Sequence, residues 1–240
     1  MILEESVLLV GAGGLGCGAA LALAAAGLRH LVVVDDDVVE ESNLHRQVLH
    51  KNAAVGMPKA QSLAATLAQR YPSVEVTQMQ TRFDATSAAR LLQGCAALVD
   101  ASDNFRTKFL CNDAAVLARI PLVHAAVAGL RGQLLAVAAG GRPCYRCLFE
   151  DLPPPDAGVG PPAGPLGPVP GVLGALQGTE AMRFLRGAPA FVGRLLQYDA
   201  ASLSMRLVRL RPNPHCAVCG TRPTILGLDP SAYSMQRSSP

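Results

Sequence analysis

The stretch from Val7 to Asp35 constrains the fold of this chain more than any other. A short apolar run, Val7–Val10, precedes the glycine-rich sequence from Gly11 to Gly16, and an alanine-rich run then leads to a second apolar run that ends at Asp35. This pattern is typical of a strand, a glycine turn, a helix and a second strand that ends in an acidic residue. Glycines are needed because the backbone must turn tightly and let phosphate approach without a Cβ in the way.

The same stretch predicts a nucleotide site. The first amides of the helix lack backbone partners and lie at the positive end of the helix dipole, so they can receive phosphate. Asp35 is placed to accept hydrogen bonds from ribose hydroxyls. The candidate nucleotide-binding residues of the turn are Gly11, Gly13, Gly14 and Gly16. This fingerprint alone does not separate an ATP site from the site of an NAD-dependent oxidoreductase.

The remaining pattern predicts one α/β domain over residues 1–220, with a loosely held tail over 221–240. We expect a Rossmann-like, doubly wound sheet that is mostly parallel, with antiparallel strands near the C-terminus and a zinc knuckle. Helices are expected at about 58–71, 86–92, 104–119 and 171–187. Further strands are expected at about 74–77, 97–100, 121–127, 133–138, 195–198 and 203–210.

Residues 152–170 differ sharply in composition, because proline and glycine dominate them. Such a segment is not expected to form regular helix or strand. We expect a flexible loop that crosses over the sheet.

Composition excludes several classes of protein. The net charge is +3 with no long basic run, which gives no support for nucleic-acid binding. Residues 7–28 carry no charge and are long enough to cross a bilayer, but their glycines weaken helix propensity. Glu4 and Glu5 in front of them are wrong for a signal peptide. We therefore expect a cytoplasmic protein without a membrane span.

Four of the seven cysteines form two CxxC pairs, Cys144 with Cys147 and Cys216 with Cys219. Two such knuckles supply four thiolates, which close a tetrahedral zinc site and leave no open position for catalysis. Unpaired thiols or a redox CxxC motif are the alternatives. The predicted zinc is structural and would tie the strand that follows Gly141 to the C-terminal part of the chain. The three loose thiols, Cys17, Cys95 and Cys111, fit a reducing compartment rather than a disulfide framework.

A second group of polar residues follows successive predicted strands: Asn43, Arg46, Gln47, Lys59 and Asp103. In a doubly wound sheet, the segments after the strands converge on the glycine turn. Arg46 and Lys59 can neutralise charge that develops at a phosphate, and Asp103 can hold Mg²⁺. Each residue taken singly is more often a solvated surface group. His45 and His124 are interpreted as structural.

Eight ordered motifs resemble the MoeB/ThiF family, the small relatives of ubiquitin-activating enzymes. They are GAGGLG, Asp35, SNLHRQ, VGMPKA, DASDN, PCYRC, GVLGALQGTEA and NPHCAVCG, and they span about residues 6 to 220. The resemblance implies ATP-dependent adenylation of the C-terminal glycine carboxylate of a small ubiquitin-like sulfur-carrier protein that ends in Gly-Gly, with release of pyrophosphate. It also implies a homodimer.

Carried over by position, the resemblance assigns Gly14 to the nucleotide and Asp35 to its ribose. Asn43, Arg46 and Lys59 would face the phosphates, and Asp103 would bind magnesium. The four CxxC cysteines match the zinc ligands of the family. Two readings of other classes stay open at this point: an NAD-dependent oxidoreductase, and a non-catalytic scaffold that binds a ubiquitin-like partner.

The sequence departs from the family in two places. Family members usually begin with further residues, including a basic helix whose arginine reaches the partner's ATP site. Here the first apolar run starts at Val7, so we expect that element to be absent or truncated. ThiF-type members also carry a cysteine in the crossing loop that joins the carrier protein. Gly160 stands at that position, and no cysteine occurs between Cys147 and Cys216, so sulfur is expected to come from a separate persulfide donor.

Overall fold

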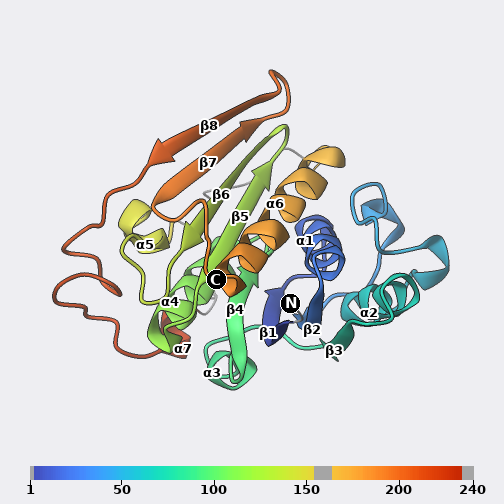
Figure 1. Ribbon diagram of the computed structural model, residues 1–240, viewed down its shortest axis with the longest axis horizontal. Helices are drawn as coiled ribbons and strands as arrows, with labels where there is room; N and C mark the ends of the chain where they lie inside the picture. The colour runs from blue at the N-terminus through green and yellow to red at the C-terminus, as the bar shows by residue number, and fades with distance from the viewer. Residues whose placement is uncertain (1–2, 154–163, 234–240) are drawn as a thin grey trace, which may run out of the picture.

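The computed structural model describes residues 3–153 and 164–233. In these residues eight strands form one sheet, in the order β3-β2-β1-β4-β5-β6-β7-β8 (Figure 1). The strands are β1 (Leu3–Val10), β2 (Leu28–Val34), β3 (Glu75–Met79), β4 (Cys95–Asp100), β5 (Leu122–Ala128), β6 (Arg131–Val137), β7 (Arg194–Asp199) and β8 (Ser204–Arg209). The first five in chain order pair in parallel. β5 to β8 pair antiparallel, which confirms the predicted fold class.

Helices cover both faces of this sheet. They are α1 (Gly14–Ala25), α2 (Lys59–Arg70), α3 (Ala88–Leu91), α4 (Phe105–Ala118), α5 (Tyr145–Leu148), α6 (Pro168–Leu185) and α7 (Pro230–Tyr233). Two 3₁₀ turns, Glu41–Asn43 and Asn52–Ala54, interrupt the long polar segment after β2. One apolar cluster joins the sheet to α1, α2 and α6. A second cluster joins the other face to α3, α4 and α5.

Helices α1 and α6 lie side by side (Figure 1), and glycines allow their close approach. A Cβ on Gly174 of α6 would lie 2.2 Å from the carbonyl oxygen of Leu15 in α1. A Cβ on Gly178 would lie 2.5 Å from the carbonyl oxygen of Ala19. Since real Cβ atoms do not approach backbone atoms this closely, only glycine fits at these positions of the helix pair.

The sequence-based boundaries hold within a few residues for most elements. Asn104 caps α4 as expected, because its Oδ1 accepts a hydrogen bond from the Thr107 amide at 2.9 Å. The α2 helix begins directly after Pro58, also as expected.

Two expectations about the proline-rich region and its surroundings are wrong. Pro168–Pro170 belong to α6, because proline is tolerated in the first turn of a helix, where its missing N–H has no partner to lose. The residues after Gly141 form the short helix α5 rather than a strand. Most of the expected crossing loop, including Gly160, lies outside the described residues.

The chain after Gly220 contacts the second apolar cluster. Ile225, Leu228 and Tyr233 pack against it, and the Tyr233 hydroxyl lies 2.6 Å from a carboxylate oxygen of Asp113 in α4. The division into one domain and a loose tail stays a prediction. Among the described residues, no helix has the length and apolar character to span a membrane.

Candidate active site

A large cavity of about 1180 Å³ opens at the carboxyl ends of β1, β2 and β4 and extends across the sheet toward β7 and β8. Eight of the residues singled out from the sequence line it: Gly11, Gly13, Gly14, Asp35, Arg46, Gln47, Lys59 and Asp103. They come from five separate segments of the chain. The expected convergence on the glycine turn is therefore present in the structure.

The glycine turn is held from two sides. A carboxylate oxygen of Asp35 accepts a hydrogen bond from the Ala12 amide at 2.7 Å, and the other oxygen accepts from the Asp37 amide at 2.8 Å. On the opposite side, His50 Nε2 lies 2.9 Å from the Ala12 carbonyl oxygen. Because that oxygen can only accept, Nε2 carries the proton. Burial raises the pKa of Asp35 above its ordinary value, against the effect of these amides and of Lys59.

The two predicted cations have partners of different kinds. Lys59, whose side chain is 10% exposed, pairs with Asp37 at 2.9 Å. Arg46 donates to Oδ1 of Asn43, and its other terminal nitrogen lies 3.3 Å from His45 Nε2. Each cation thus lies beside the cavity with a hydrogen-bonding neighbour that restricts its position.

Asp103 occupies the loop between β4 and α4. Its side chain is exposed to the cavity, whereas Asp100, three residues earlier, is fully buried. An exposed carboxylate in a cavity lined by cations has the oxygen ligands that Mg²⁺ takes together with substrate phosphates. The exposed carboxylate of Asp103 therefore fits the predicted magnesium site.

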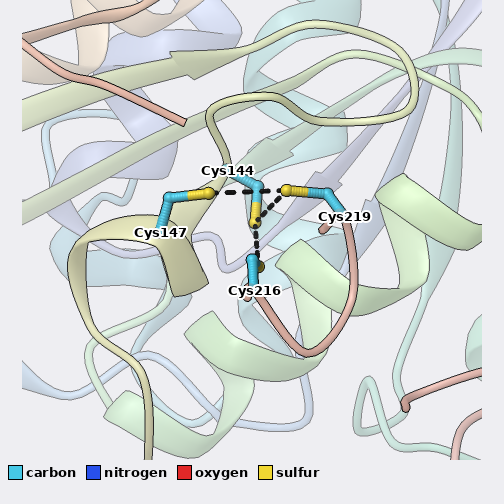
Figure 2. A group of neighbouring side chains, drawn as sticks. All are labelled: Cys144, Cys147, Cys216 and Cys219. Carbon is cyan, nitrogen blue, oxygen red and sulfur yellow. Dashed lines mark hydrogen bonds between the residues drawn. The ribbon is translucent and has the colours of Figure 1, made fainter. Parts of the chain in front are cut away.

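The four CxxC cysteines converge, and Figure 2 shows their side chains pointing toward one another. Their sulfur atoms all lie within 4.8 Å of each other, with Sγ–Sγ distances of 3.6 Å for Cys144 to Cys216 and 3.4 Å for Cys147 to Cys219. Four sulfurs at the Zn–S bond length of about 2.3 Å would be separated by about 3.8 Å in a tetrahedron. The cluster therefore fits a closed zinc site that ties α5 to the chain after β8.

The sequence matches the ThiF family over residues 1–218. The chain belongs to the ThiF family. The resemblance to the MoeB/ThiF enzymes is thereby confirmed.

Two relatives illustrate how this ThiF-family chain compares in sequence. It is 47% identical over 223 residues to the SAMP-activating enzyme E1 of Haloferax volcanii, covering 91% of this chain and 82% of that protein. It is 44% identical over 234 residues to the adenylyltransferase and sulfurtransferase MOCS3 of Anopheles gambiae, covering 94% of this chain and 52% of that protein. The chain thus spans about half the length of the MOCS3 relatives that it matches.

The fold of this ThiF-family chain is also similar to solved structures. Escherichia coli MccB with MccA-N7isoASN superposes with a TM-score of 0.81 at 21% identity, covering 92% of this chain and 68% of that one. PaaA superposes with a TM-score of 0.74 at 20% identity, covering 88% of this chain and 66% of that one. At these identities the likeness concerns the fold alone.

Two predicted nucleotide-binding residues do not line the cavity. Gly16 packs beneath the turn, where a Cβ would lie 2.0 Å from the Gly11 carbonyl oxygen. Asn43 contacts Arg46 and Glu40 rather than the cavity. In this ThiF-family chain Gly16 packs within the turn and Asn43 contacts Arg46, and the assignment of both to nucleotide binding stays a prediction.

The sequence reasoning missed several cavity residues, among them Asp37, Ser102 and Lys108. The signal for Asp37 was available, because it follows Asp35 closely in the run of three aspartates. Lys108 precedes an apolar run in α4, where a lysine needs a specific partner to be buried. His124, interpreted as structural, is fully buried.

The three cysteines outside the cluster are buried. Burial raises the pKa of the Cys17 thiol to about 12 and that of Cys95 to about 11, and it raises the pKa of Cys111 well above the ordinary value. Such thiols are poor nucleophiles, because the thiolate is the reactive form. We therefore expect that none of the three acts as a relay thiol in this ThiF-family chain.

Proposed function

We propose that this chain is an ATP-dependent adenylyltransferase that activates the C-terminal glycine carboxylate of a small ubiquitin-like sulfur carrier ending in Gly-Gly. The products would be the acyl-adenylate and pyrophosphate. The observation that carries the proposal is the single cavity in which the glycine turn, Asp35, Arg46, Lys59 and Asp103 meet. The adenylyltransferase activity of relatives such as MOCS3 supports it, as their names state.

The reaction needs alignment and charge neutralisation rather than a general base. The attacking carboxylate is ionised at neutral pH, so no proton has to be removed from it. A carboxylate and a phosphate repel one another, which makes positioned cations the main source of rate enhancement. Arg46 and Lys59 supply those cations, and the amides after the glycine turn receive phosphate oxygens. Asp35 would hold the ribose.

Asp103 would hold Mg²⁺. The ion, when bound, neutralises charge on the triphosphate and orients it. The cysteine cluster would hold one Zn²⁺ with a structural role, since four protein ligands leave no open position.

The cavity has room for both reactants. Its far end is lined by Gln133 of β6, Gln197 of β7 and Arg206 of β8, across the sheet from Asp35. A nucleotide at the glycine turn would leave this end free for the tail of a carrier protein.

An NAD-dependent oxidoreductase has no evident use for Arg46, Lys59 and Asp103 around the phosphate.

Sulfur transfer is proposed to need a separate persulfide donor, because the sequence from Cys147 to Cys216 contains no cysteine between them. AMP is a good leaving group, so an external persulfide can attack the activated carbonyl directly. We further propose a cytoplasmic homodimer, in keeping with the family resemblance.

The test is ATP–pyrophosphate exchange with a ubiquitin-like sulfur carrier encoded in the same genome. The matched control is the same carrier without its terminal glycine. Exchange that depends on the intact carrier supports adenylation. Carrier binding without exchange would show a scaffold instead, and tighter binding of NADH than of ATP with Mg²⁺ would favour the oxidoreductase.

A further inference from the structure

A buried lysine lies directly behind the loop that carries Asp103. Lys108 is in the first turns of α4, and its side chain is 5% exposed. Its ammonium donates to the Ser102 carbonyl oxygen at 2.6 Å and to the Ala125 carbonyl oxygen at 2.7 Å. It also lies 3.5 Å from a carboxylate oxygen of Asp100. This one ammonium therefore connects α4 to the β4–α4 loop, to the last residue of β4 and to strand β5.

Asp100, the last residue of β4, fixes the same loop from the strand side. One carboxylate oxygen accepts from both the amide and the hydroxyl of Ser102, at 3.0 and 2.5 Å. The other accepts from His124 Nδ1 at 2.6 Å. Gln177 of α6 donates to the Asp100 carbonyl oxygen at 2.7 Å. A carboxylate buried this deeply needs a neighbouring cation, and Lys108 is that cation.

These contacts hold every polar group of Ser102. Its amide and hydroxyl bind Asp100, and its carbonyl binds Lys108. Asp103 is the next residue, and it faces the cavity that Lys108 also lines. Asn104 after it caps α4. The backbone on both sides of Asp103 is thus fixed. Lys108 contributes the hydrogen bond that connects helix α4 to the Ser102 carbonyl oxygen.

We propose that Lys108 is a positioning residue for the metal–phosphate site: by holding the Ser102 carbonyl, it sets where the Asp103 carboxylate meets the magnesium–nucleotide complex. This deepens the adenylyltransferase proposal and rests on it. Partners that orient a metal ligand commonly change metal affinity when they are removed. A lysine that merely balanced the charge of Asp100 would affect stability but not metal affinity.

The test compares Lys108→Gln with the wild type in the binding of Mn²⁺ together with ATP, followed by electron paramagnetic resonance without any carrier protein. We expect Lys108→Gln to weaken Mn²⁺ binding by about 10-fold to 100-fold. The Mg²⁺ concentration that half-saturates ATP–pyrophosphate exchange should rise in parallel. Lys108→Arg keeps the charge and should recover part of the loss.

Arg106→Gln is the matched control, because Arg106 lies on the same turn and does not line the cavity. It should leave Mn²⁺ binding unchanged. If Lys108→Gln does not fold, Ser102→Ala removes one hydrogen bond of the same network and should weaken Mn²⁺ binding in the same direction, by less.

Wild-type Mn²⁺ affinity in a folded Lys108→Gln or, failing that, in Ser102→Ala would overturn the proposal, even where thermal stability falls. So would a wild-type protein that binds no Mn²⁺ with ATP. A wild type that binds Mn²⁺ and ATP but shows no carrier-dependent exchange would instead contradict the adenylyltransferase function, while the binding comparison still decides the role of Lys108.

Discussion

The ammonium nitrogen of Lys59 lies 2.9 Å from a carboxylate oxygen of Asp37, at the rim of the cavity. The two side chains differ in their surroundings, because 10% of Lys59 is exposed but 69% of Asp37 is. An incoming triphosphate would meet a lysine that already has an anionic neighbour. Phosphate and Asp37 would then compete for one ammonium.

This competition predicts opposite effects of two substitutions. Lys59→Ala should raise the Kd for ATP with Mg²⁺ by about 10-fold to 100-fold, because it removes a charged hydrogen bond. Asp37→Asn should lower that Kd at low ionic strength, and the gain should disappear as salt screens the carboxylate. Calorimetric titration at two salt concentrations measures both. Weaker binding by Asp37→Asn would mean that Asp37 positions Lys59 instead of competing for it.

The cysteine cluster predicts one zinc ion per chain. Cys144→Ser should lose the metal and lower the melting temperature together, because a structural site contributes its binding free energy to folding. Metal analysis and thermal unfolding on chelator-free preparations provide the two readouts. Cys95→Ser, outside the cluster, should keep the full zinc content. Wild-type protein that contains no zinc contradicts the prediction.

The helix pair α1–α6 predicts different outcomes for two glycines of one helix. Gly174→Ala should lower the free energy of unfolding by about 1–3 kcal/mol, because its Cβ would overlap the Leu15 carbonyl oxygen. Gly171→Ala has open space for its Cβ and should raise stability by about 0.4–1 kcal/mol. Urea unfolding of both variants measures the difference. Equal effects would show that helix propensity, not packing, governs these sites.

Two buried histidines predict that stability falls in mild acid. Burial lowers the pKa of His50, which faces Asp35 and Lys59, and of His124, which faces Asp100 and Lys108. A histidine with a lowered folded pKa contributes its full stability above the unfolded value of about 6.5, and the contribution is lost as pH falls below it. The urea midpoint should therefore drop between about pH 7.5 and 5.5.

Substitution of these histidines should reduce that drop. His124→Asn keeps a donor for Asp100 and removes the titration, so its midpoint should depend less on pH. His215→Asn, at an exposed position, should show the full wild-type drop. An unchanged pH dependence in His124→Asn and His50→Asn would contradict the assignment. Lys108 and His124 lower the pKa of Asp100 against the effect of burial. The stability that this carboxylate contributes is lost in a separate pH range, below about pH 4.

The sequence predicts the parts of the site that depend on local pattern. Asp35 directly follows a strand, Lys59 starts a helix and Asp103 precedes a helix cap, so each could be placed from its neighbours in sequence. The contacts of Asp100 with Lys108 and His124 could not be placed, because they join three elements whose packing a linear pattern does not reveal. The position of Gly16 outside the cavity could not be predicted for the same reason: the glycine pattern does not say which glycine lines the cavity and which packs against backbone.

The pairing of α1 with α6 has a consequence for the synthesis of the chain. Arg186, just past α6, donates a hydrogen bond to the Ala26 carbonyl oxygen, 160 positions earlier. Helix α1 is therefore synthesised well before α6, the helix that packs against its apolar face. Contacts of such high sequence separation form slowly, and the waiting surface is exposed to aggregation. A nascent chain stalled before α6 should need chaperone protection that the completed chain does not.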